Sequence, residues 1–201
     1  MRLRIVLFFC LTSATLCAAQ SSSNPKPLPD NPVPQSYRPL DSSSRLRWVV
    51  RSTVGWESLT AGTITAGIGT AEDRPKEYGT HFDGFAHRYG MRLAGVATSN
   101  VMEATLGAIW GEDPRYFRAG RSAPFKTRVK RVVYETFYAR QRDGGYELAS
   151  ARLIAIPASN FLSNSWRADS EANVHDALVR TLLGFTGHMT RNAWEEFKVR
   201  H

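Results

Sequence analysis

Small residues recur at intervals of four in three apolar segments of this 201-residue chain. The three series are Ala61, Thr65 and Gly69; Gly107 and Gly111; and Ala151, Ala155, Ser159 and Ser163. In an α-helix, residues four apart lie on one face, so each series would form a face without bulky side chains. Such a face allows two helix backbones to approach closely, either in a membrane or in a tightly packed bundle in water.

Apolar residues repeat with helical rather than alternating spacing from Arg45 onward, which predicts an all-α fold. We therefore predict a compact multi-helix bundle with small-residue helix contacts. A strand at Val129–Phe137 is the main alternative. Helices are predicted within Trp48–Thr70, Lys76–Trp110, Phe125–Arg140, Tyr146–Phe161 and a last segment that begins near Asp169 or Ser170.

Two of these helices carry apolar stripes that we expect to face the core. In Phe125–Arg140 the stripe is formed by Val129, Val132, Val133 and Phe137. In the last helix it is formed by Val174, Leu178, Leu182, Phe185, Met189, Ala193 and Phe197. Asp169 or Ser170 is placed to cap this last helix, and Pro157 is expected to kink or shorten the helix before it.

Residues 1–19 have the pattern of a secretory signal peptide, with Arg2 and Arg4 before an apolar core and small residues before Gln20. The apolar run is shorter than the roughly 20 residues that a spanning helix needs. We therefore expect an exported protein of the periplasm or outer envelope. Both cysteines lie in this leader, so the mature chain would have no disulfide, thiolate metal site or cysteine nucleophile.

Residues 20–44 differ in composition from the rest of the chain. Six of the ten prolines and two serine runs lie here, which is typical of a disordered, semi-extended linker. The helical domain is then expected to span residues 45–201. Removal of the leader would lower the formal net charge from +8 to +6.

The predicted helices carry charges that argue against membrane-spanning segments. Residues 91–110 include Arg92 and Glu103, and residues 146–164 include Arg152. A charge at the bilayer centre costs about 2.5 to 3.5 kcal/mol on insertion scales. We therefore expect peripheral rather than integral association with a membrane, and carbonate extraction would test the integral alternative.

The most distinctive stretch is Gly111–Arg118, with the sequence GEDPRYFR. Pro114 makes Asp113 extended and ends the preceding helix. Glu112 and Asp113 then either form ion pairs with the arginines of a rigid turn, or act as an acid–base or ligand pair. We favour the rigid turn, because no histidine and no metal-ligand spacing accompanies the two carboxylates.

This stretch, with the Gly-rich helix before it and the basic segment after it, resembles a family of small exported proteins from acidobacteria-type bacteria. The shared pattern is a Gly-rich helix followed by an E/Q-D-P-R-Y-F motif. The resemblance covers Glu77–Phe197 and includes Tyr78-Gly79, Tyr89-Gly90 and Leu162-Ser163-Asn164. Ser165-Trp166-Arg167 stands where an aromatic pair with proline would be usual. No activity is known for the family, so the resemblance implies export and a compact helical domain but no catalytic residues.

Other candidate residues give weaker signals. Glu103 and Arg152 interrupt apolar helical faces, either as a buried pair or, as we favour, at the solvent edge of each helix. His188 is a weak catalytic candidate. His81 and His87 lie six apart, unlike a metal pair on one helix face. No nucleophile elbow, phosphate loop or dinucleotide fingerprint is present, and we expect no metal and no cofactor.

The densest charge cluster, here called the basic run, is formed by Arg118, Arg121, Lys126, Arg128, Lys130 and Arg131. It is either an ordinary solvated face or a site for a polyanion. Export argues against nucleic acid, so an anionic lipid or another envelope component is the expected partner. Self-association through the small-residue faces is a second possibility.

Two function hypotheses follow. The first is an exported, cell-envelope-associated protein of structural or binding type, without enzymatic activity, that contacts an anionic membrane surface. The second is an envelope hydrolase acting on lipid or glycan that uses Glu112 and Asp113 with Glu103 or His188. The hydrolase requires these side chains to converge on one cleft.

Overall fold

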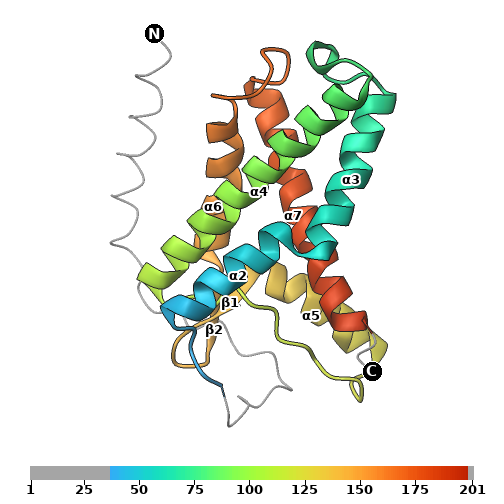
Figure 1. The fold of residues 1–201 in the computed structure, drawn as a ribbon. Coiled ribbons are helices and arrows are strands. Elements are labelled where there is room, and N and C mark those ends of the chain that lie inside the picture. Colours follow the sequence, from blue (N-terminus) through green and yellow to red (C-terminus); the bar gives the residue numbers. More distant parts are fainter. Residues whose placement is uncertain (1–36, 199–201) are drawn as a thin grey trace. The chain divides into compact units, whose positions relative to one another are not determined.

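Helices account for most of the structure, a computed structural model that describes residues 37–198 (Figure 1). The α-helices are α2 (Ser42–Val54), α3 (Trp56–Ala71), α4 (Phe82–Trp110), α5 (Phe125–Phe137), α6 (Ser150–Ser163) and α7 (Val174–Phe197). The other elements are the 3-10 turn η2 (Lys76–Tyr78) and the strands β1 (Tyr138–Arg140) and β2 (Tyr146–Leu148). The predicted mostly helical, compact fold is confirmed. The predicted signal peptide and most of the predicted linker lie outside the described residues.

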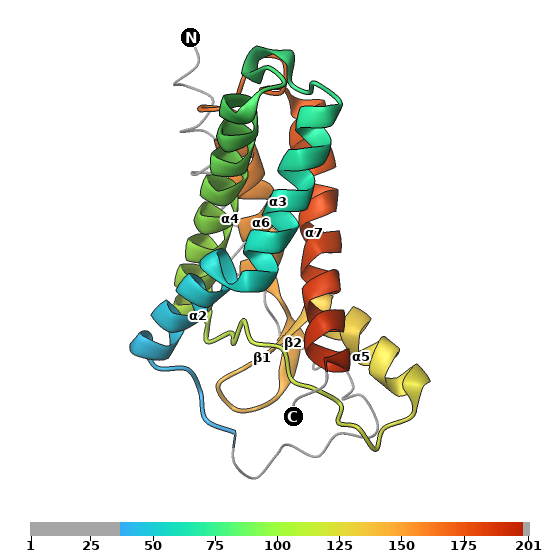
Figure 2. The ribbon, with the colours of Figure 1, turned by 45° about the vertical axis from the view of Figure 1, so that its right-hand side comes forward.

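The longest helix, α4, contacts α3, α6 and α2, while α7 packs on α6 and on α5. In two views, α3, α4, α6 and α7 run side by side, with α2, α5 and the strands at one end (Figures 1 and 2). We call this the basal end. The opposite, distal end consists of residues 72–81 and 164–173, which are joined by a hydrogen bond from Ala168 N to the Tyr78 hydroxyl (3.1 Å).

A break at Gly55 separates α2 from α3, which the sequence pattern had merged into one segment. A Cβ at Gly55 would lie 2.2 Å from the carbonyl oxygen of Arg51, so a side chain does not fit at this corner. The Asp41 carboxylate accepts a hydrogen bond from Ser44 N (3.0 Å) and caps α2. Helical structure therefore begins at Ser42, three residues before the expected start of the domain.

A short antiparallel hairpin follows α5 and was not predicted. Strand β1 pairs with β2, with Arg140 opposite Tyr146. Gly144 closes the turn with a φ of 88°, a conformation that favours glycine. Strands of three residues are too short for an alternating pattern to reveal them. Val129–Phe137, where the sequence left a strand open, is helical.

The small-residue face of α6 is buried, as expected. All four of its members are at most 2% exposed: Ala151, Ala155, Ser159 and Ser163. In α3 the predicted small-residue series began with Ala61 and Thr65. The residues that are buried are instead their neighbours Gly62 and Ala66, so the buried face is shifted by one position. A Cβ at Gly62 would approach the Tyr89 ring to 2.9 Å, so α3 and α4 come together at this glycine.

The apolar stripe of α7 faces outward, so the prediction that it is buried is wrong. Leu182 is 68% exposed, and Val174, Leu178 and Phe197 are exposed as well. The buried positions of this helix are Ala177, Thr181, His188, Asn192 and Glu196. Periodicity shows that the two faces of a helix differ, but the neighbouring helices decide which face is covered. Here they cover the small and polar face.

In α5 three of the four stripe residues, Val129, Val133 and Phe137, are exposed, and Val132 is buried as predicted. Arg131 and Glu135 of the same helix are buried. Within the described residues, nine hydrophobic residues are buried, and seven of them are alanines. The two larger ones are Val132 and Ile156. The interior of this fold is therefore made mainly of small and polar side chains.

Two details of α6 and α7 differ from the expectation. The Asn173 side chain, rather than Asp169 or Ser170, caps α7 by accepting a hydrogen bond from Asp176 N (2.9 Å). Pro157 lies inside α6, which continues to Ser163. Among the described residues, no helix has the length and apolar composition that crossing a membrane requires.

Candidate functional site

The GEDPRYFR stretch leads from α4 into the basal end. Gly111 ends α4 in a left-handed conformation with a φ of 87°. The backbone N–H of Asp113 donates to the carbonyl oxygen of Arg140 (2.8 Å), which ties the stretch to β1. Arg115 donates from Nε to Asp113 Oδ1 (3.0 Å) and from Nη2 to Oδ2 (2.6 Å). The geometry is thus that of the ion-paired turn we favoured from the sequence.

The second half of the stretch is held by Glu196 of α7, whose carboxylate is fully buried. Its Oε2 accepts hydrogen bonds from the Tyr116 hydroxyl and from Ala119 N, both at 3.0 Å. Its Oε1 accepts from Arg128 Nε at 2.7 Å. Arg118 donates a hydrogen bond to the backbone carbonyl oxygen of Glu196 at 2.8 Å. One carboxylate therefore fixes the loop against the C-terminal end of α7.

A second buried carboxylate, Glu135 of α5, joins the same loop to the hairpin. Its Oε2 accepts from Phe117 N (2.7 Å), and its Oε1 accepts from the Tyr146 hydroxyl (2.8 Å) and from Arg131 Nη1 (3.2 Å). Burial raises the pKa of Glu135, while these donors lower it. The Glu135 carboxylate thus has a structural role, because it joins the loop at Phe117 to the hairpin at Tyr146 and to α5.

Arg140 lies buried among aromatic rings beneath the loop. Its guanidinium carbon is 4.5 Å from the ring centre of Phe117, 4.8 Å from that of Tyr146 and 5.1 Å from that of Tyr37. Its Nη2 donates to the Tyr146 hydroxyl (3.0 Å). Ring faces attract a cation that has been removed from water.

Glu103 and Arg152 form a buried ion pair between α4 and α6, so the favoured placement at the solvent edge is wrong. Arg152 Nε lies 2.9 Å from Glu103 Oε1, and its Nη1 donates to the carbonyl oxygens of Glu135 (2.7 Å) and Thr136 (3.0 Å). The close approach of α4 to the small-residue face of α6 places both side chains between the helices.

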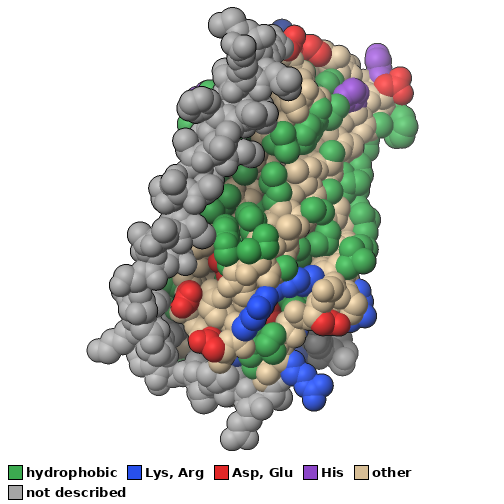
Figure 3. All heavy atoms as spheres, turned by 90° about the vertical axis from the view of Figure 1, so that its left-hand side faces the viewer, with side chains coloured by type: hydrophobic (Ala, Val, Ile, Leu, Met, Phe, Trp, Pro, Cys, Tyr) green, Lys and Arg blue, Asp and Glu red, His purple; other side chains and the backbone are tan. Residues whose placement is uncertain are grey.

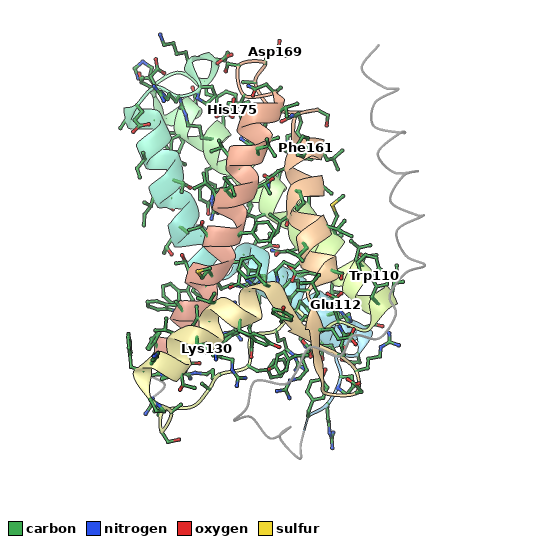
Figure 4. The ribbon with its side chains drawn as sticks, turned by 180° about the vertical axis from the view of Figure 1, so that it is seen from behind. Trp110, Glu112, Lys130, Phe161, Asp169 and His175 are labelled. Atoms are coloured by element: carbon green, nitrogen blue, oxygen red, sulfur yellow. The ribbon has the colours of Figure 1, made fainter. Side chains whose placement is uncertain are left out.

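Glu112 lies beside this pair, near the end of α4 and next to the strands (Figure 4). Its carboxylate oxygens accept from Ala151 N, in the first turn of α6, at 3.1 and 3.2 Å. The space that it lines with Glu103, Asp113 and Arg152 has no room for a water molecule. Burial raises the pKa of Glu112 to about 7, although the Ala151 N–H and Arg152 oppose the shift.

This raised pKa predicts a pH-dependent difference in stability between the protein and its Glu112→Gln variant. The folded state holds the Glu112 proton more tightly than the unfolded state, whose pKa is about 4.5. The stability that the protonated carboxyl provides is complete below about pH 4.5 and is lost as the pH rises through 7, by about 3 kcal/mol. Glutamine, which does not ionise, should therefore stabilise the fold relative to wild type increasingly between pH 5 and 8.

The measurement is the free energy of unfolding of both proteins by denaturant at several pH values. Burial also lowers the pKa of His188, so this residue makes stability depend on pH as well. Its effect on the free energy of unfolding is the same in both proteins and cancels in their difference. A constant difference across this pH range would contradict the prediction.

The catalytic candidates do not form an open cleft. Glu103, Glu112 and Asp113 line the same narrow space, but Arg152 binds Glu103 and Arg115 binds Asp113. His188 is buried on α7, with Arg191 Nη2 2.8 Å from its Nε2. Among the described residues, no group of three or more His, Cys, Asp and Glu is arranged to hold a metal ion.

The basic run divides into inward and outward side chains. Arg118, Arg128 and Arg131 contact α7 or Glu135 inside the basal end. Arg121, Lys126 and Lys130 are exposed. Figure 4 labels Lys130 on α5 at the basal end, opposite Asp169 and His175 at the distal end. Half of the side chains of the basic run are therefore engaged inside the basal end.

Glu135, Glu196 and Arg140 were not predicted as organising residues. For Glu135 and Glu196 the available signal was their place on helices whose apolar side was assumed to be buried. Had the other side been assigned to the interior, each carboxylate would have required a buried partner. Arg140 lies on the short strand β1, which gives no such signal.

Comparisons with protein-family models, curated proteins and solved structures found no match to this chain.

Proposed function

We propose that this chain is an exported, cell-envelope-associated helical protein of structural or binding type whose basal end contacts an anionic membrane surface. The observation that carries the proposal is the exposed face of α5. It combines Lys126 and Lys130 with Phe125, Val129 and Val133. A helix with cationic and bulky apolar side chains on its outer surface is suited to lie in a membrane interface.

The inner face of α5 strengthens this assignment. Arg131 and Glu135, its buried charged residues, are engaged with each other, and Glu135 also binds the 111–120 loop. The charges that face outward are thus lysines on an otherwise apolar surface. An anionic headgroup layer attracts such lysines, and the apolar side chains beside them would lie at the acyl boundary.

Helix α2 offers a second surface of the same kind at the same end. Leu46, Val50 and Val54 are exposed beside exposed Arg47 and Arg51. Two such helices at one end of the bundle would hold that end against the membrane more strongly than either helix alone.

Neutralising the two lysines of α5 should weaken binding to anionic vesicles. Each Lys near an anionic surface contributes about 1 kcal/mol, so Lys126→Gln/Lys130→Gln should lower the partition coefficient roughly 30-fold at low salt. The measurement is co-sedimentation with vesicles that contain phosphatidylglycerol, at low and high salt, where screening should remove most of the difference.

The matched control is Arg74→Gln/Lys76→Gln, which removes the same charge from two exposed residues of the distal end. This control should bind like wild type. Equal loss in both double variants would show a non-specific charge effect. Equal binding of wild type to anionic and neutral vesicles would remove the headgroup contact from the proposal.

A further inference from the structure

In the described domain more polar than hydrophobic residues are fully buried, which is unusual for a protein that folds in water. Seventeen polar or charged residues are buried, against the nine mostly alanine hydrophobic ones. Bulky apolar side chains such as Ile64 (63% exposed) and Ile109 (69% exposed) are on the surface. Burial of large apolar side chains is the main force that folds a chain in water, and here only Val132 and Ile156 among them are fully buried in the described residues.

The exposed apolar residues are not confined to one side of the bundle. They include Ile64 and Ile68 of α3, Val101 and Ile109 of α4, Ile154 of α6, and Val174, Leu178, Val179, Leu182 and Leu183 of α7. All four helices of the bundle therefore contribute to them. We call this surface the apolar belt.

Charges are sparse along the belt on α3, α4 and α6, whereas α7 carries the part-buried Arg180, which donates to the carbonyl oxygen of Glu171 (3.0 Å), and the part-buried Arg191 beside His188. Helix α3 has no charged residue between Glu57 and Glu72, and α6 has none after Arg152. In α4 the only acidic or basic residue after Arg92 is buried Glu103. On the face seen in Figure 3, charged side chains gather at the two ends, with apolar and uncharged ones between them.

The interior has the interactions that hold helices together in lipid. Small-residue faces bring the backbones close, and polar side chains bond between helices, as Asn100 Nδ2 does to Thr53 Oγ1 (3.0 Å). The charges that argued against a membrane location, Glu103 and Arg152, face each other inside. Arg92 points its Nη1 at the carbonyl oxygen of Ser58 in α3 (3.1 Å). None of these three charges is placed on the belt.

Tryptophans mark the basal edge of the belt. Trp56 and Trp194, at the basal ends of α3 and α7, are exposed and meet edge to face with ring centres 5.3 Å apart. Trp110 lies at the basal end of α4 (Figure 4). Tryptophan is enriched where the hydrocarbon of a bilayer meets the headgroups, which is the level that the proposed function assigns to the basal end.

We propose that the apolar belt is immersed in the acyl chains of a lipid bilayer, with the basal end at the headgroups. This inference rests on the proposed function and extends it from surface contact to insertion. Between the charged residues Glu57 and Glu72, α3 has 14 uncharged residues, which correspond to about 21 Å of helix. This length is shorter than the hydrocarbon core of a bilayer, which is about 30 Å thick. A second copy of the chain would cover one side, whereas lipid covers all four helices at once.

The test places one fluorescent label at a time on the full chain and measures its depth. The two cysteines, Cys10 and Cys17, are first replaced by serine, so that a single new cysteine takes the label NBD. Belt positions are Ile64→Cys, Val101→Cys and Leu182→Cys, and the matched end positions are Lys76→Cys and Lys126→Cys. Vesicles of phosphatidylcholine, with and without phosphatidylglycerol, carry nitroxide groups on the acyl chains or on the headgroups.

We expect all three belt labels to shift to shorter emission wavelengths and to be quenched more strongly by acyl-chain than by headgroup nitroxides. The basal label at Lys126→Cys should show the opposite preference, and the distal label at Lys76→Cys should be quenched less by acyl-chain nitroxides than the belt labels are. The comparison is between positions of one chain, so binding through any other segment does not produce this pattern.

Belt labels that stay unquenched on vesicle-bound protein would overturn immersion while leaving the headgroup contact intact. Quenching on one helix only, together with a dimeric mass by light scattering, would also overturn it and identify a second copy as the cover. Quenching of all belt labels in purely neutral vesicles would support immersion and contradict the anionic preference of the proposed function.

Discussion

Replacement of Glu196 by alanine is expected to destabilise the fold by about 3 to 5 kcal/mol. The fully buried carboxylate is the shared partner of Arg128, the Tyr116 hydroxyl and Ala119 N. Removing it leaves a partly buried cation and two donors without their acceptor, and each of these has lost its contact with water. The measurement is the free energy of unfolding by denaturant, with wild type under the same solvent conditions.

The neighbouring residue provides a matched control. Glu195 is partly exposed and pairs with Lys198, so Glu195→Ala should cost less than about 1 kcal/mol. Glu196→Ala should also expose the 111–120 loop to proteolysis, because that carboxylate fixes the loop to α7. Similar, small losses in both variants would show that Glu196 does not anchor the loop.

The ion pair between Glu103 and Arg152 should be strongly coupled. Each single variant, Glu103→Leu or Arg152→Met, leaves one buried charge without its partner and should cost about 3 to 5 kcal/mol. The double variant replaces both charges by apolar side chains and should lose about 2 to 3 kcal/mol less than the sum of the two. The carbonyl oxygens of Glu135 and Thr136 still lose their donor, so the double variant does not return to wild-type stability.

A second double-mutant cycle calibrates this value. Arg167 and Glu171 form an ion pair four residues apart near the distal surface, where coupling should be about 0.5 kcal/mol or less. If the buried cycle showed no more coupling than this one, the Glu103–Arg152 pair would not contribute to holding α4 against α6.

The helices themselves followed from local sequence patterns. The 3.6-residue spacing and the small residues of α6 were visible without any knowledge of neighbours, because they depend on backbone geometry within one helix, whereas the corner at Gly55 was not predicted. The hairpin was not visible, because Tyr138–Arg140 and Tyr146–Leu148 are too short to show a period. The ion-paired turn at Asp113 and Arg115 was also accessible, since the two residues are only two positions apart.

The candidate site could be predicted only in outline. The sequence offered two arrangements for Glu103 and Arg152, and a charge next to apolar residues gives no means to choose between them. Their partnership depends on the approach of two helices 49 positions apart in the chain. Glu135 and Glu196 were not identified for the same reason, since the loop that covers them lies elsewhere in the sequence.

The sequence by itself determined that this chain forms amphipathic helices with one small or polar side and one bulky apolar side. It could not determine which side faces inward, because periodicity is identical for a helix and for its inverted placement. Only the tertiary structure decided this, through small-residue contacts and buried ion pairs that bring the polar sides together. As a result, exposed side chains of the apolar α7 stripe, such as Leu182, lie on the surface. Half of the charged side chains of the basic run lie inside the basal end.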